Sequence, residues 1–129
     1  MTSKVLIIDD DPLLRELAVE LLTEAGHDCA VAEDGRVGIA SLEAQAVDLV
    51  LLDMIMPNMD GVETLGEIKT RWPDLPVVVM SAGTRSMGMQ SLLRLASNLG
   101  ADEVMQKPLK REVLLPLAER LTGRAARAA

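Results

Sequence analysis

Several polar side chains that could do chemistry follow directly after short apolar runs. The runs are Val5–Ile8, Leu49–Leu52 and Val77–Met80, with a weaker one ahead of a Lys-Pro pair, and the polar residues that follow them are Asp9, Asp10, Asp11, Asp53, Ser81 and Lys107. If the runs are parallel strands, their carboxyl ends meet at one edge of a sheet, where ligands bind. Carboxylates gathered there repel one another unless a divalent cation or an ammonium group lies among them. The sequence therefore predicts a cation site at this edge.

Mg²⁺ is the cation that fits these side chains best. It takes oxygen ligands, uses one or two carboxylates and keeps waters that a phosphate can share. A carboxylate can also act as a nucleophile toward phosphorus, while an ammonium and a hydroxyl offset the charge on the phosphoryl oxygens. The chemistry indicated is phosphoryl transfer to an aspartate.

The elements that must position these groups alternate along the chain. The three runs above, together with Cys29–Ala32 and the weaker Val104–Met105, are predicted strands, and we expect the four stronger ones to be buried on both faces. Apolar residues at helical spacing lie between and after them: Leu13, Leu14, Leu17, Leu21, Leu22; Val37, Ile39, Ala40, Leu42; Val62, Leu65, Ile68; Leu92, Leu93, Ala96, Leu99; Val113, Leu114, Leu117, Leu121. This alternation predicts a doubly wound α/β fold with a five-stranded parallel sheet.

Two local features set helix boundaries. Asp11 is the predicted N-cap of the first helix, with Pro12 in its first turn. Pro116 lies too deep in the last helical pattern for a first turn, so we expect a kink or a later helix start.

Length and composition indicate one small domain. The 129 residues divide into a domain over 1–122 and a tail over 123–129 that we expect to be frayed. The net charge of −7 argues against binding to nucleic acid or to anionic lipid, and no uncharged run is long enough to span a membrane.

The single cysteine, Cys29, excludes an internal disulfide and, with the single histidine, His27, leaves too few ligands for zinc. We therefore expect a cytoplasmic protein. Cys29 is predicted to be a small core residue, and His27, at a helix end, is predicted to be exposed. Trp72 is expected to pack under the end of the third helix.

Four segments, "VLIIDDDP", "LLDMIMPNMDG", "VVVMSAG" and "EVMQKPL", occur in this order across nearly the whole chain. Together they resemble the receiver domain of two-component response regulators, of which chemotaxis receivers are examples. The resemblance implies a flavodoxin-like (βα)5 fold with strand order 2-1-3-4-5, an order that the periodicity alone does not predict.

The resemblance also implies a role for each acid. Asp53 matches the phosphoacceptor, which takes its group from a phosphohistidine on a sensor histidine kinase or a phosphotransfer protein. Asp10 and Asp53 match direct Mg²⁺ ligands, Asp9 matches a residue that acts mostly through water, and the main-chain carbonyl of Ile55 completes the protein's share.

Two further positions match the groups that contact the phosphoryl oxygens in the family. Ser81 matches the hydroxyl that binds one of these oxygens, and Lys107 matches the ammonium that pairs with the phosphoryl group. The bond between Lys107 and Pro108 is cis in the family, and a proline lowers the energy of that isomer.

Three departures from the family pattern affect the expected signalling. Val104 stands where the family usually has an aromatic residue, so a swinging ring cannot couple the site to the far surface. The segment "GTRSMGMQ", residues 83–90, lies in a connection that is longer than usual by about four residues, roughly one helical turn. Ile55, two after the acceptor, cannot orient a hydrolytic water, which predicts a long-lived phosphoryl group.

The sequence supports a stand-alone receiver that signals through phosphorylation-dependent contacts with a downstream protein, as a monomer or weak dimer. It is not expected to be an enzyme beyond assisting its own phosphorylation and dephosphorylation. The alternative in the same class is a receiver cut from a longer DNA-binding or enzymatic regulator.

Two other classes are disfavoured. An aspartyl-nucleophile phosphatase with Mg²⁺ resembles a DxD pattern, whereas Met54 and Ile55 follow Asp53. A flavodoxin-like nucleotide-binding module needs a glycine-rich loop after the first strand, where this chain has acids.

Overall fold

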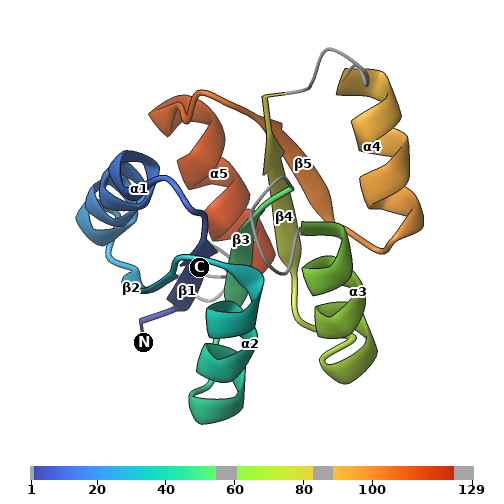
Figure 1. The fold of residues 1–129 in the computed structure, drawn as a ribbon. Coiled ribbons are helices and arrows are strands. Elements are labelled where there is room, and N and C mark those ends of the chain that lie inside the picture. Colours follow the sequence, from blue (N-terminus) through green and yellow to red (C-terminus); the bar gives the residue numbers. More distant parts are fainter. Residues whose placement is uncertain (1, 55–60, 83–88, 124–129) are drawn as a thin grey trace.

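The computed structural model describes residues 2–54, 61–82 and 89–123, without the side chains of residues 89, 92 and 93. Strands and helices alternate from the amino end to the carboxyl end of this part of the chain (Figure 1). The elements are β1 (Lys4–Ile8), α1 (Pro12–Glu24), β2 (Asp28–Ala32), α2 (Gly35–Ala44), β3 (Leu49–Asp53), α3 (Gly61–Arg71), β4 (Val77–Ser81), α4 (Met89–Asn98), β5 (Glu103–Gln106) and α5 (Arg111–Thr122).

The five strands form one parallel sheet in the order β2-β1-β3-β4-β5, which confirms the predicted fold class and strand order. The strand order reverses between β1 and β3, where the chain that has wound outward to β2 returns to the centre. Ile8 pairs with Leu52 across this junction. The residues that follow them, Asp9 and Asp53, therefore lie at the same level of the carboxyl edge.

Helices cover both faces of the sheet, with α1 and α5 on one side and α2, α3 and α4 on the other (Figure 1). Alternate strand residues face each layer: Leu6, Ile8, Val50 and Leu52 belong to one core cluster, and Val5, Ile7, Leu49 and Leu51 to the other. All are at most 1% exposed, and each such side chain stabilises the fold by about 1.5–3 kcal/mol relative to exposure. This double burial makes the sheet a rigid base for its edge.

The edge strand β2 differs from the prediction. We expected it to be buried on both faces, but Val31 is 48% exposed and Cys29 is only partly buried. The reason is position: β2 pairs with β1 alone, so its other side has no neighbouring strand. The prediction for His27 is also wrong, since the residue just before β2 is 3% exposed.

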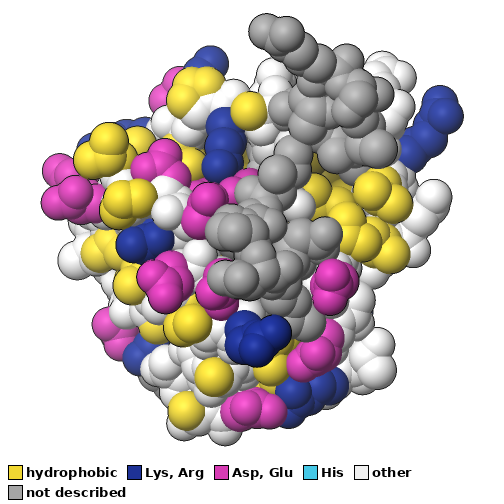
Figure 2. All heavy atoms as spheres, in the orientation of Figure 1, with side chains coloured by type: hydrophobic (Ala, Val, Ile, Leu, Met, Phe, Trp, Pro, Cys, Tyr) yellow, Lys and Arg dark blue, Asp and Glu magenta, His cyan; other side chains and the backbone are white. Residues whose placement is uncertain are grey.

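The first helix begins as predicted. Asp11 is its N-cap and accepts a hydrogen bond of 3.0 Å from Leu13 N, and Pro12 is the first helical residue. The apolar stripe, however, is wider than the buried face, because Leu13 and Leu17 are 74% and 41% exposed. Figure 2 shows apolar side chains at the surface in the region of α1.

The last helix includes Pro116 within its bounds, so it does not start later, and the alternative expectation of a kink stays a prediction. Proline lacks the N–H that would close one helical turn, yet burial of Leu114 and Ala118 on either side holds the segment against the sheet. Gly123, with φ of 69°, ends the helix in the left-handed conformation that glycine adopts readily. Residues 124–129 lie outside the described residues, and the frayed tail stays a prediction.

Trp72 follows α3 directly and is partly buried against one core cluster, as expected. The guanidinium of Arg71 lies over the Trp72 ring, with Cζ 4.5 Å from the ring centroid. Among the described residues, no helix is both long enough and apolar enough to cross a membrane.

Candidate phosphoacceptor and cation site

The sheet brings three of the predicted acids together. Asp9, Asp10 and Asp53 each offer a carboxylate oxygen, and these oxygens lie within 4.8 Å of one another. Asp53 is the last residue of β3 and Asp9 follows β1, which is its neighbour in the sheet. Strand pairing, rather than loop conformation, therefore brings Asp9 and Asp53 close together.

The ammonium of Lys107 lies among these acids. Lys107 Nζ is 3.0 Å from Asp9 Oδ2 and 3.4 Å from Asp53 Oδ1. Burial alone lowers the pKa of Lys107, but the hydrogen bonds and attraction of Asp9 and Asp53 outweigh it, so the pKa is raised above its usual value. The ammonium form is the one the site stabilises.

The lysine is itself positioned by the sheet and by the turn after it. Lys107 N donates a hydrogen bond of 3.0 Å to Ser81 O, which continues the pairing of β4 with β5. The Lys107–Pro108 peptide bond is cis, as the resemblance implied.

Three of the four polar atoms of Asp9 make hydrogen bonds. Its carboxylate Oδ1 accepts a hydrogen bond of 2.9 Å from Asp11 N, and its main-chain N donates one of 3.1 Å to Ala32 O. Its carbonyl oxygen accepts a hydrogen bond of 2.8 Å from Arg15 Nη1. Oδ2 is buried, has no hydrogen bond of ordinary geometry and has the Lys107 ammonium as its ionic neighbour.

The donor set fits a hard divalent cation. Lys107 pairs with two of the three carboxylates, and its one positive charge leaves a formal surplus of two negative charges in the cluster. Asp9 is fully buried and Asp53 is 5% exposed, whereas Asp10 is exposed to solvent. Oxygen ligands with one side open to water are what Mg²⁺ takes when it keeps part of its hydration shell.

Ser81 lies close to this cluster by register. Asp53 pairs with Met80, so Ser81 is one residue further along the neighbouring strand, and its side chain is 2% exposed. The hydroxyl thus belongs to the same edge of the sheet as the acceptor.

Gly61 shows how closely the chain packs behind Asp53. A Cβ atom at Gly61 would lie 2.5 Å from Asp53 O and 2.4 Å from Met54 Cα, distances that no side chain can occupy. Gly61 N also donates a hydrogen bond of 3.2 Å to Met54 O. Gly61 begins α3 directly against the end of the strand that carries Asp53.

Arg15 is the site residue that sequence reasoning did not single out. Its signal was a single basic residue inside the apolar stripe of the first helix, four residues after the N-cap Asp11. In the sequence, such a residue indicates only a solvent-exposed position, whereas in the structure its guanidinium donates a hydrogen bond to Asp9 O.

Three predicted features concern other positions. Ile55, whose carbonyl was assigned to the cation, and residues 83–88 of the long connection lie outside the described residues. Val104, on β5, is partly buried and packs against the core cluster that contains Val79. It fills space there as an aliphatic residue.

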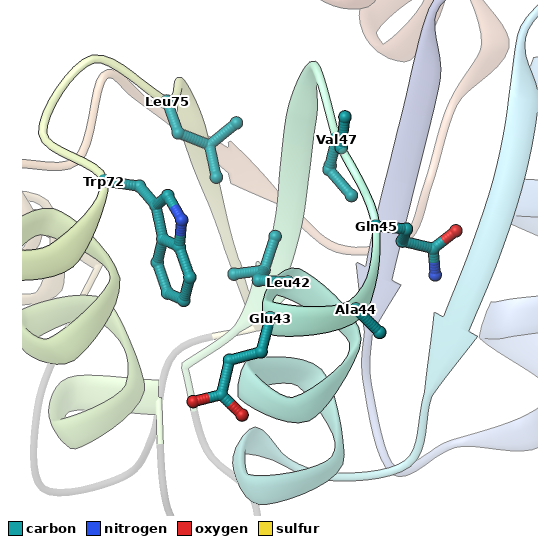
Figure 3. A pocket seen from close by; sticks show the side chains of 8 residues that line it. Leu42, Glu43, Ala44, Gln45, Val47, Trp72 and Leu75 are labelled. Carbon is teal, nitrogen blue, oxygen red and sulfur yellow. The ribbon is translucent and has the colours of Figure 1, made fainter.

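A hollow of about 480 Å³ lies at the opposite, amino edge of the sheet (Figure 3). It lies between the end of α2 and the segment after α3, and its lining residues are Leu42, Glu43, Ala44, Gln45, Ala46, Val47, Trp72 and Leu75. The only carboxylate among these eight residues, that of Glu43, is paired with Arg71 at 2.7 Å. The hollow therefore has no part in the acid cluster.

The fold and the site together define a class: a doubly wound α/β protein with acids and a lysine at the carboxyl edge of a parallel sheet. A family model for the response regulator receiver domain matches residues 5–119. The chain belongs to this family.

Similar proteins and solved structures support the same family assignment. The chain is 35% identical over 121 residues to the response regulator protein FleR of Pseudomonas aeruginosa, covering 93% of this chain and 24% of FleR. It is 39% identical over 106 residues to the transcriptional regulatory protein CpxR of Klebsiella pneumoniae, covering 82% of this chain and 43% of CpxR. It thus spans less than half the length of these two curated relatives.

Two solved structures are similar over almost their full length. The receiver domain of NtrX from Brucella abortus is 31% identical with a TM-score of 0.83, covering 92% of this chain and 98% of that one. The chemotaxis protein CheY4 of Vibrio cholerae is 25% identical with a TM-score of 0.85, covering 94% of this chain and 99% of that one.

Proposed function

We propose that this receiver accepts a phosphoryl group on Asp53. The observation that carries the proposal is the placement of a nearly buried carboxylate at the end of a central strand, 3.4 Å from an ammonium and beside two further acids. A carboxylate oxygen of Asp53 forms a bond to phosphorus. The bond from phosphorus to the donor's imidazole nitrogen breaks, and its electron pair stays on that nitrogen.

Asp10 and Asp53 would bind Mg²⁺ directly, Asp9 would act mostly through water, and the main-chain carbonyl of Ile55 would complete the set. Asp9 suits an indirect role because its Oδ1 already accepts a hydrogen bond and its Oδ2 faces Lys107. The ion, when bound, offsets the negative charge that builds up when a phosphate approaches a carboxylate. Asp10, the exposed member, keeps one side of the site open to solvent and to the donor.

Lys107 and Ser81 would bind the oxygens of the transferred group. The raised pKa of Lys107 keeps its ammonium charged, so the lysine can exchange its contact with Asp53 for one with a phosphoryl oxygen. Ser81 supplies a hydroxyl from the neighbouring strand. Both groups lie on main chain fixed by the sheet, and such preorganised groups stabilise developing charge efficiently.

The donor is a phosphohistidine on a sensor histidine kinase or a phosphotransfer protein. Support comes from an apolar hollow of about 440 Å³ beside the acids, lined by the exposed Leu13 and Leu17 of α1 together with Asp11, Leu14, Ala82, Lys107, Pro108 and Leu109. Exposed leucines next to a charged site favour contact with a protein rather than with a small phosphate ester alone. A related segment occurs within the sensor histidine kinase RcsC of Salmonella typhimurium, at 34% identity over 110 residues.

The output is a phosphorylation-dependent contact with another protein, made by a cytoplasmic, monomeric or weakly dimeric domain over residues 1–122. The alternative is a receiver joined to a DNA-binding or enzymatic part, as the lengths of FleR and CpxR suggest for those relatives. The phosphoryl group should be long-lived, because the aliphatic Ile55 cannot orient water. Loss within seconds in an autodephosphorylation time course with Mg²⁺ would overturn that expectation.

Intact mass after incubation with acetyl phosphate and Mg²⁺ tests the acceptor. We expect one added phosphoryl group in the wild-type protein and none in Asp53→Ala, because no other carboxylate of the cluster both ends a strand and contacts Lys107. Asp10→Ala, which keeps the acceptor, is expected to react slowly rather than not at all. Sustained turnover of a phosphate monoester would instead favour a phosphatase.

A further inference from the structure

Arg15 lies on α1, one turn into the helix, and reaches back to the strand end. Its Nη1 donates a hydrogen bond of 2.8 Å to the carbonyl oxygen of Asp9. This carbonyl lies just past the last ladder pair of β1 with β2, Ile8 with Ala32, where the sheet stops supplying partners. A guanidinium donor makes a stronger bond to such a carbonyl than a neutral group does.

The hydrogen bond from Arg15 is one of several that fix the main chain on both sides of Asp10. On one side of Asp10, the main chain is fixed by Asp9 N to Ala32 O and by Arg15 to Asp9 O. On the other side, Asp11 N donates to Asp9 Oδ1, and Asp11 caps α1. The residue in the middle is therefore held by its two neighbours.

Asp10 needs this support because its own side chain is exposed and makes no hydrogen bond or ion pair with any described residue. Among the described residues, the main chain on either side of Asp10 is therefore what sets the direction of its carboxylate, whose oxygen lies within 4.8 Å of one of Asp53. Groups that orient metal ligands contribute strongly to metal affinity, even though they do not touch the ion.

We propose that Arg15 is a positioning residue for the cation site: by holding the Asp9 carbonyl, it fixes the main chain that aims Asp10 at Asp53. This inference rests on the proposed Mg²⁺ site. It concerns affinity for the ion and is measured without any phosphoryl transfer.

A rival role for Arg15 predicts the opposite sign. If Arg15 acted only as a positive charge near the acids, its removal would tighten Mg²⁺ binding, because one repulsive charge would be gone. If Arg15 positions Asp10, its removal weakens binding. The sign of the change therefore separates the two roles.

The experiment measures the Kd for Mg²⁺ from the rise of Tm with Mg²⁺ concentration at constant ionic strength, starting in EDTA. Arg15→Met keeps the apolar stem and removes charge and donors, and we expect its Kd to be higher by about tenfold. Arg15→Lys retains the charge and part of the bond and should fall between. Arg36→Met is the matched control. Arg36 is exposed in the first turn of α2 and its side chain makes no ion pair or hydrogen bond with another described residue, so its removal should leave the Kd unchanged.

The route through Asp10 is tested in an Asp10→Asn background, where Arg15→Met should add less than about a twofold change. An equal loss in both backgrounds, or a Kd that is unchanged or lower in Arg15→Met, overturns the proposal. If Arg15→Met does not fold in EDTA, the Arg15→Lys series carries the same comparison. If the Tm of the wild-type protein does not change with Mg²⁺ concentration, the proposed cation site itself is contradicted.

Discussion

Two lysines join loops at opposite edges of the sheet, Lys69 at the amino edge and Lys107 at the carboxyl edge, and their partners differ. Lys69 Nζ donates to Asp102 Oδ2 and to Leu75 O, each at 2.8 Å. Asp102 Oδ2 also accepts a hydrogen bond of 2.8 Å from Val77 N. One ammonium, one carboxylate and main-chain groups thus satisfy one another, as in a structural clamp between the loops before β4 and β5.

At the carboxyl edge, Lys107 faces Asp9 and Asp53, with Asp10 within the same cluster. Lys107 pairs with two of the three carboxylates, and the guanidinium of Arg15 binds the carbonyl of Asp9 rather than a carboxylate, so the acids of the cluster outnumber the ammonium that pairs with them. The comparison shows that both clusters use the same residue types, but Lys69 and Asp102 balance each other's charge whereas the carboxyl-edge cluster is short of positive charge. An imbalance of this kind costs stability without a ligand and gives affinity for a cation.

Removing the ammonium of Lys107 should have the largest effect on stability. In Lys107→Met, the buried carboxylate of Asp9 loses its ionic partner, so we expect the free energy of unfolding to fall by about 3–5 kcal/mol in EDTA. Saturating Mg²⁺ should recover part of this loss, because a cation then replaces the missing charge. Urea unfolding with and without Mg²⁺ measures both, and Lys110→Met, an exposed lysine nearby, is the control.

Removing the other lysine should cost less and should not respond to Mg²⁺. Lys69→Met removes the ammonium from Asp102, which keeps its hydrogen bond from Val77 N, and takes this donor from the Leu75 carbonyl, and we expect a loss of about 1–3 kcal/mol. Lys4→Met breaks an exposed pair with Asp28 at 3.6 Å and should change stability by about 1 kcal/mol or less. A Mg²⁺-dependent recovery in Lys69→Met would contradict the division between the two clusters.

The carboxyl-edge cluster could be predicted from sequence because each member follows a recognisable strand. Asp9, Asp53 and Ser81 come directly after apolar runs, and parallel strands place such residues at one edge whatever their separation in the chain. The fold class followed from the same alternation of runs and helical stripes. The strand order came only from the resemblance, since periodicity does not say which strands are neighbours.

Other features could not be read from the sequence because they depend on position in space. Val31 is in an apolar run but is half exposed, since β2 has a neighbour on one side only. His27 was expected at the surface and is buried. The clamp of Lys69 with Asp102 joins residues 33 apart in sequence through loops with no motif. Arg15 looks like any surface arginine until its carbonyl partner is seen.

Removing one surplus charge should stabilise the protein in the absence of the ion. Asp10→Asn keeps the size of an exposed side chain and removes a carboxylate that has other acids nearby, so we expect a gain of about 0.2–1 kcal/mol in EDTA. The Mg²⁺-dependent rise in Tm should be largely lost. Asp48→Asn, which removes an acid at the amino edge, should leave that rise intact, and a stabilising response to Mg²⁺ equal to that of the wild type would argue against Asp10 as a ligand.

The smallest expected effect is on the pH dependence of stability. The pKa of Lys107 is raised above 10.5 in the folded protein, so the folded state keeps this proton after the unfolded chain has released it. The stabilisation that the charged Lys107 gives the folded protein is therefore complete below pH 10.5 and is lost as pH rises through the pKa of Lys107 in the folded state. Lys107→Arg carries a charge that does not titrate in this range and should not show this loss.

The measurement compares the free energy of unfolding of the wild type and Lys107→Arg in EDTA, at matched pH values below and above 10.5. We expect the difference, wild type minus variant, to become less favourable to the wild type as pH increases. Other lysines titrate in both proteins, so their contributions cancel in this difference. Parallel curves would mean that Asp9 and Asp53 do not hold the proton on Lys107, and the carboxyl-edge cluster would then owe its stability to something other than this ammonium.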